Sequence, residues 1–258
     1  MTTDDLVIAL AGLAAGAING IAGGGSLVLF PVLIALGYTA RTANVTTTVG
    51  IWTGYLGGMA GFRAQLADQR RRVRTFAPVA MTGGLVGAVL LLVTSDALFR
   101  SIAPWLILAA CGLFAAQPWL TARARARAAS VSGAPPGVTV EVVPRAALAG
   151  TFLAAIYGGY FGAGLGVILL AVLGLTLEDT LNRINGLRGV LSLLVNSIAV
   201  VVFAITADVA WRAAGILTVA SLVGGYAGAR LSLRLEPAVL RAVVVTFGVI
   251  AAVKLLVS

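Results

Sequence analysis

The chain has 258 residues, of which 60% are hydrophobic and only 10% are charged, and its mean hydropathy is +1.03. A soluble domain of this composition would expose a largely apolar surface, and the recurring apolar segments are continuous rather than alternating. The composition therefore excludes a soluble globular domain and a β-barrel. It predicts an all-α, polytopic integral membrane protein that lies in the lipid bilayer.

The net charge of +9 comes from 18 Lys and Arg against 9 Asp and Glu. In a membrane protein such an excess is typical of cytoplasmic loops, so we do not expect nucleic-acid binding. There is no histidine, and the single cysteine, Cys111, lies in an apolar run where it is expected only to pack. We expect no metal and no cofactor. The N-terminus has neither the positive charge nor the cleavage site of a signal peptide, so the first apolar segment is expected to stay in the mature protein.

Residues 6–36 are apolar but are interrupted by the cluster Gly23-Gly24-Gly25. At about 1.5 Å per residue, this stretch exceeds one straight crossing of a ~30 Å hydrocarbon core. Glycine costs a helix interior about 1 kcal/mol relative to alanine. The cluster therefore predicts a break, either within one broken helix or between the two half-helices of a re-entrant hairpin.

Three crossings are expected next, at 40–62, 76–94 and 98–120, with a polar loop rich in arginine after the first. Residues 121–145 begin with three arginines, at 123, 125 and 127, which are followed by serine, glycine and proline. They predict a basic helix end followed by a flexible linker.

The second half of the chain repeats this pattern, with an apolar stretch at 146–175 around a second glycine cluster. Crossings are expected at 184–206, 213–233 and 238–257. Three glycines of each cluster align at one constant offset, and two further matches share a second offset. These matches are Gly20, Gly23 and Gly25 with Gly159, Gly162 and Gly164, Gly83-Gly84 with Gly224-Gly225, and Arg100 with Arg241. The predicted organisation is a first transmembrane repeat (1–121), a cytoplasmic linker (122–145) and a second repeat (146–258).

The distribution of basic residues separates two topologies. If the glycine segments are re-entrant, each half crosses three times, the halves are inverted, and 13 of the 18 basic residues face the cytoplasm. If all eight apolar segments span the membrane, only 11 of the 18 basic residues face the cytoplasm. The positive-inside rule favours the inverted, re-entrant arrangement, with the basic loops at 63–74 and 121–145 in the cytoplasm.

Inverted repeats with paired discontinuous helices are typical of transporters, whose substrates bind near the midplane at half-helix N-termini. Such a terminus carries unpaired N–H groups and about half a positive charge, so it suits an anion. The alternative is that the glycines only allow close helix packing.

Arg188 is the one charge that falls inside a predicted crossing. An intramembrane arginine is costly and usually functional, and its guanidinium can hold an oxyanion with two parallel hydrogen bonds. The alternative is that Arg188, two turns from the helix start, snorkels to the interface. All carboxylates lie in loops or at segment ends, which argues against a carboxylate proton relay and against cation transport. Neither a phosphate-binding loop nor a nucleophile–base pair is present, so an enzyme is not expected.

Two stretches resemble the TauE/SafE sulfite exporter family: residues 16–26 with Pro31, Gly37 and 43–48, and residues 157–166 with 181–188 and Asn196. The resemblance implies a transporter, by usual assignment an exporter, of sulfite or an organosulfonate in the bacterial inner (cytoplasmic) membrane. Family members often have Lys at the position of Arg188 and Thr-Ser at Thr47-Thr48, so substrate choice could differ.

The leading hypothesis is a transporter of a small sulfur-containing oxyanion that binds between the two glycine breaks and moves by alternating access. The alternative is a non-transporting membrane assembly subunit whose glycines serve packing. Small-xxx-small spacings also permit a homodimer. The candidate substrate-binding residues are Asn19, Gly23, Gly24, Gly25, Ser26, Thr46, Thr47, Gly162, Gly164, Asn185, Arg188 and Asn196.

Overall fold

The computed structural model describes residues 2–22, 24–59, 66, 69–131, 143–231 and 237–257, and within them all regular structure is α-helical. The first half contains α1 (Thr3–Ala22), α2 (Ser26–Ala35), α3 (Ala40–Met59), α5 (Arg70–Val93) and α6 (Asp96–Val131). The second half contains α7 (Arg145–Tyr160), α8 (Leu165–Thr176), α9 (Leu181–Thr206), α10 (Trp211–Leu231) and α11 (Pro237–Val257). The first glycine cluster falls between α1 and α2, and the second falls between α7 and α8.

The outer faces of the long helices are apolar. Val93, Leu153, Ile205 and Val219 each leave 66–78% of their surface exposed, which suits contact with lipid tails and not with water. Three of the described helices, α5, α6 as far as Ala126, and α9, are long and apolar enough to cross a bilayer. The chain is an all-helical, multi-pass membrane protein.

One expected boundary needs correction, because the arginines of the predicted polar loop from Arg70 onward lie in the first turns of α5. The predicted basic helix end is the last part of α6, which runs to Val131. Arginine is a good helix former, and a helix can extend past the bilayer because its backbone hydrogen bonds are internal. Residues 63–65 of the predicted loop and 132–142 of the predicted linker lie outside the described residues.

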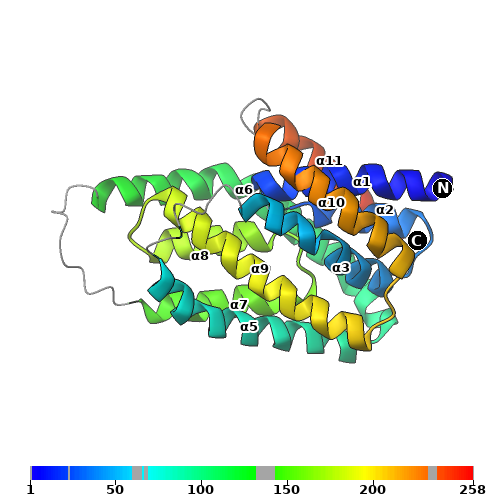
Figure 1. Ribbon diagram of the computed structural model, residues 1–258, viewed down its shortest axis with the longest axis horizontal. Coiled ribbons are helices and arrows are strands. Elements are labelled where there is room, and N and C mark those ends of the chain that lie inside the picture. Colours follow the sequence, from blue (N-terminus) through cyan, green and yellow to red (C-terminus); the bar gives the residue numbers. More distant parts are fainter. Residues whose placement is uncertain are drawn as a thin grey trace.

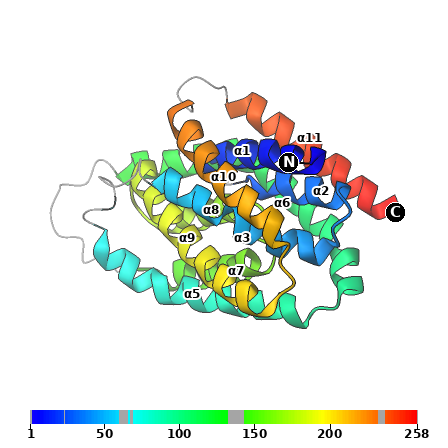
Figure 2. The same cartoon turned by 45° about the vertical axis from the view of Figure 1, so that its right-hand side comes forward.

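The two halves of the chain exchange helices. In Figures 1 and 2, α3 and α9 cross the middle of the bundle, and they pack against each other there. Helix α5 of the first half packs against α7 and α9 of the second, and α10 of the second half packs against α1 and α3 of the first. Each half therefore completes its core with a helix from the other half.

Glycines let these helices from different halves approach each other closely. A Cβ atom placed on Gly87 of α5 would lie 2.0 Å from the carbonyl oxygen of Ile156, and one on Gly228 of α10 would lie 2.7 Å from that of Ala17. Ala17 and Ile156 are 139 residues apart, the offset that also relates the two glycine clusters. Equivalent backbones therefore meet in equivalent ways at the two crossings, and no larger side chain fits between them.

Ion pairs lie at both ends of the bundle. At the end where α5 and α9 begin, Asp179 accepts hydrogen bonds from Arg72 and from Nε of Arg183, the latter at 2.8 Å. At the other end, where the N-terminus lies (Figure 1), Asp5 accepts from Nε and Nη2 of Arg212 at 3.1 and 2.7 Å. The Arg72–Asp179 and Asp5–Arg212 pairs join different halves of the chain, whereas Arg183–Asp179 lies within the second half.

We expect Gly87→Ala to destabilise the protein by at least about 1–3 kcal/mol, because the new methyl group would meet backbone and not a movable side chain. The matched control is Gly112→Ala on α6, where nothing lies within 4 Å of the added Cβ and helix propensity favours alanine. Melting temperatures in detergent would compare the two variants. Equal melting temperatures would show that the helix crossing tolerates a side chain.

The Asp5–Arg212 pair predicts a pH dependence. The hydrogen bonds from Arg212, together with one from the backbone of Thr2, lower the pKa of Asp5 to about 2. Because the folded pKa lies below the unfolded value of about 3.9, the stabilisation is complete above pH 4 and is lost as the pH falls towards 2. Asp5→Asn should therefore melt below wild type at pH 6, and the difference should shrink between pH 4 and pH 2. A constant difference across this range would contradict the pairing.

Candidate functional site

The first glycine break depends on close contacts. A Cβ on Gly24 would lie 2.0 Å from the ring of Phe114 in α6, and one on Gly25 would lie 2.1 Å from the carbonyl oxygen of Ala15 in α1. Gly25 itself has helical dihedral angles, and Ser26, half-buried, begins α2 without a side-chain cap. Gly23 lies outside the described residues. The absence of side chains at 24 and 25 thus lets α2 start directly against α1 and α6.

The second break depends on backbone conformation. Gly162 and Gly164 have φ values of 76° and 78°, in the left-handed region that other residues rarely adopt. The hydroxyl of Tyr157 holds the turn by donating to the carbonyl oxygen of Ala163 at 2.7 Å. In the described part of the chain, no hydrogen bond is recorded for the N–H groups of Ala163 and Gly164, which directly precede α8. The turn therefore leaves donors at a helix N-terminus, as an anion site needs.

The two breaks lie near each other. Phe30 of α2 packs edge-on against Phe161 of the second break, with ring centroids 5.4 Å apart. Asn44 of α3 donates to the carbonyl oxygen of Tyr160 at 2.9 Å, at the end of α7. Residues from the first half thus pack against, and hydrogen-bond to, the second break.

Arg188 lies on the buried face of α9, with 9% of its surface exposed. A snorkelling arginine keeps its guanidinium in water, so this burial argues against snorkelling. Among the described residues, no carboxylate pairs with Arg188 and no hydrogen bond reaches it. Removing one partner from a buried ion pair typically costs about 3–5 kcal/mol, so a buried cation without a partner indicates a place for an anion.

Three further polar side chains surround this region. Tyr55 of α3 has Asn19 of α1, Asn196 of α9 and Arg188 as its polar neighbours. Asn19 is 7% exposed, and its Nδ2 has no hydrogen-bond partner in the described structure. Asn196 donates from Nδ2 to the carbonyl oxygen of Ser192 at 2.8 Å. Arg188 and Asn19 thus offer N–H donors, and Tyr55 offers a hydroxyl, to a ligand bound among α1, α3 and α9.

The other predicted residues are not gathered here. Thr46 is buried, and its hydroxyl accepts a hydrogen bond from the backbone N–H of Ala210, just before α10. It precedes Tyr55 by nine residues, or about 13 Å along α3. Thr47 is buried with an unpartnered hydroxyl, and Asn185 is half-buried one turn before Arg188. Thr46 therefore lies well along the bundle from Arg188 and ties α3 to the α9–α10 connection.

Two residues of this region escaped the sequence analysis. Tyr55 follows Gly54 on a helix rich in small residues, a pattern that indicates helix packing and does not single out a hydroxyl. Asn44 lies in the stretch 43–48, from which only Thr46 and Thr47 are predicted to bind substrate. The sequence carried no signal for Tyr55, because nine residues are two and a half turns and place Tyr55 on the face of α3 opposite Thr46. Only the packing of α3 against α1 and α9 distinguishes it from a lipid-facing tyrosine.

Comparisons with known proteins identify the family of the chain. The family described as "Sulfite exporter TauE/SafE" matches residues 8–255. A protein of Haemophilus influenzae named "Probable membrane transporter protein" is 24% identical over 234 residues, which is 91% of this chain and 87% of that protein. No solved structure matches the chain. Since the family match spans nearly all ten described helices, the chain belongs to the TauE/SafE sulfite exporter family of membrane transporters.

Proposed function

We propose that the protein moves a small sulfur-containing oxyanion, such as sulfite or an organosulfonate, across the bacterial inner membrane, with export as the direction. The observation that carries this proposal is the Arg188 guanidinium, which is buried in a membrane helix without a counter-ion in the described structure. A carboxylate partner would be expected if the charge served only to join helices. A transported anion supplies the missing negative charge while it is bound.

The same geometry supports a specific way of holding the anion. Arg188 donates two parallel hydrogen bonds to two oxygens of the anion, and Nδ2 of Asn19 and the hydroxyl of Tyr55 donate to the remaining oxygens. The N–H groups just before α8, at Gly164, are a second set of donors. They belong to the second glycine break, which lies near the first. Transfer of the anion between donors near the two breaks fits alternating access.

The exchanged helices support an inverted duplication. Contacts of α5 with α7 and of α10 with α1 are equivalent, as a two-fold relation between the halves requires. In this inverted arrangement, the arginine-rich start of α5 and the end of α6 face the cytoplasm. All nine carboxylates lie outside the apolar centres of the segments, so the membrane potential, negative inside, is the simplest force to drive an anion outward.

Replacing Arg188 with Gln should lower the flux of radiolabelled sulfite in proteoliposomes at least about 30-fold, because truncating one partner of a buried charge pair costs 2 kcal/mol or more. Arg125→Gln removes the same charge from an exposed position on α6 and should leave the flux unchanged. In the same preparations, sulfite should raise the melting temperature of wild type and not of the Arg188 variant. Equal flux in wild type and Arg188→Gln would refute the role of Arg188, and no melting shift with any sulfur oxyanion would favour the assembly-subunit alternative.

Tyr55→Phe removes only a hydroxyl and should raise the KM for sulfite about tenfold, the effect of losing one hydrogen bond to a charged ligand. Tyr226→Phe, on the exposed face of α10, is the matched control and should not change the KM. Flux measured against sulfite concentration separates KM from the maximal rate. An unchanged KM in Tyr55→Phe would place Tyr55 outside the binding site.

A further inference from the structure

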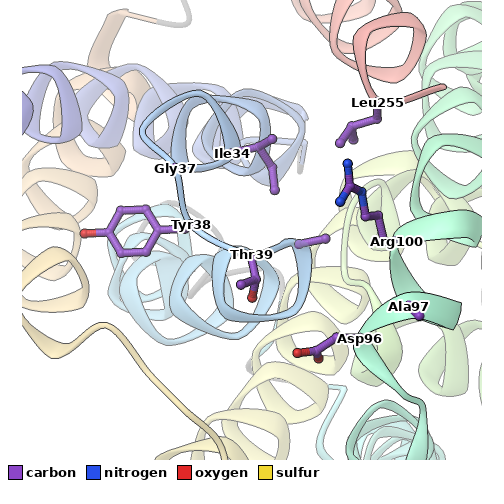
Figure 3. A pocket seen from close by; sticks show the side chains of 9 residues that line it. Ile34, Gly37, Tyr38, Thr39, Asp96, Ala97, Arg100 and Leu255 are labelled. Atoms are coloured by element: carbon purple, nitrogen blue, oxygen red, sulfur yellow. The ribbon is translucent and has the colours of Figure 1, made fainter. Parts of the chain in front are cut away.

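A cavity of about 460 Å³ opens at the end of the bundle where α6 begins. Its walls come from the α2–α3 connection, the first turns of α6 and the end of α11 (Figure 3). Helix α5 runs 24 residues, about 36 Å, from its arginine-rich start to this end. The cavity therefore lies across the bundle from the basic helix ends that we place in the cytoplasm.

The cavity carries one uncompensated positive charge. Asp96 on its wall is already paired with Arg41, whose Nη1 lies 3.4 Å from the carboxylate oxygen. Arg100 has no hydrogen bond or ion pair within the described structure, and its side chain extends between Ile34 and Leu255 (Figure 3). The N-terminus of α6 adds the positive end of its dipole. A concave, partly apolar wall around a free guanidinium concentrates anions.

Aromatic side chains separate this cavity from the second glycine break. Phe99 precedes Arg100 on α6 but points into the core, where its ring lies 5.7 Å from that of Tyr160 and 6.3 Å from that of Phe161. Phe30 closes the other side of Phe161. Phe30, Phe99 and Phe161 are each at most 3% exposed. The first turns of α6 thus place the Arg100 guanidinium at the cavity and the Phe99 ring against the second glycine break.

The other half of the chain has an arginine at the equivalent position. Arg241 matches Arg100 at the offset that also relates Gly83 to Gly224, and it lies near the start of α11 as Arg100 lies near the start of α6. Its Nε is buried without a hydrogen-bond partner in the described structure. The chain thus holds two equivalent arginines that no carboxylate of the described residues neutralises.

We propose that the cavity is an outer vestibule of the transport path, which binds a small oxyanion at Arg100 before or after passage, and that Phe30, Phe99 and Phe161 close it from the interior. The vestibule rests on the proposed function, because it assigns the anion to that path. The same guanidinium could instead hold the phosphate of an anionic lipid, so the test must separate a free oxyanion from a headgroup.

The test measures whether the cavity favours anions over cations, and it requires no transport. Ala97 is exposed and lines the cavity, so Ala97→Cys in a Cys111→Ala background offers a single thiol there. In nanodiscs of phosphatidylcholine, an anionic sulfonate-bearing thiol reagent should label it about tenfold faster than a cationic trimethylammonium reagent of equal size. Adding Arg100→Gln to this cysteine variant should abolish the preference for the anionic reagent, whereas adding Arg125→Gln should leave it unchanged. Millimolar sulfate should slow labelling only where Arg100 is present.

Three results would overturn the vestibule: no anion preference, a preference that survives Arg100→Gln, or protection by phosphatidylglycerol in the nanodisc but not by free sulfate. Thr39→Cys, also exposed on the cavity wall, repeats the assay if the Ala97 variant fails to fold. Arg188→Gln should leave the labelling pattern unchanged while it lowers sulfite flux at least about 30-fold. If the wild-type protein labels as expected but moves no sulfite, the proposed function is refuted and the anion site is retained.

Discussion

The fold depends on the close approach of α5 to α7 and of α10 to α1. In a bilayer, lipid tails are as apolar as the helices, so helix association relies on van der Waals contact and on small residues that let backbones meet. Gly87 and Gly228 bring equivalent backbones together at the two crossings, and each crossing joins different halves of the chain. Neither half has a complete core of its own. Because both crossings depend on the same kind of contact, the arrangement of α3 and α9 between them is held from both sides.

The two close helix crossings explain where buried polar side chains lie. Helices α3 and α9 lie between the two crossings and carry Tyr55 and Arg188 towards one end, Asn196 near the middle of α9 and Thr46 towards the other end. Away from lipid, a buried guanidinium can remain without a protein partner only if a ligand or water supplies one. The same enclosure keeps Asn19 beside Tyr55. The polar site is thus a consequence of the exchange that shields it.

The two glycine breaks form by different physical means. Gly24 and Gly25 are required because neighbouring atoms occupy the space of a Cβ, whereas Gly162 and Gly164 are required by positive φ angles. Aligned glycines in the sequence therefore do not have the same local role. Phe30 and Phe161 join the two breaks, and Phe99 adds the wall that separates them from the cavity at Arg100. Packing and the candidate transport path consequently share the same aromatic residues.

The sequence by itself determined the helical membrane class, the number and approximate limits of the segments, the positions of the breaks and the family, because hydropathy and glycine placement are local properties. It also singled out Arg188, since one charge in an apolar run is visible without a structure. Only the tertiary structure decided which polar residues meet: it brought Tyr55 to Arg188 and tied Thr46 to Ala210 at a distance from it. Helix limits follow from the composition of each segment, whereas such contacts depend on how α5 and α10 are exchanged between the halves, which no local pattern encodes.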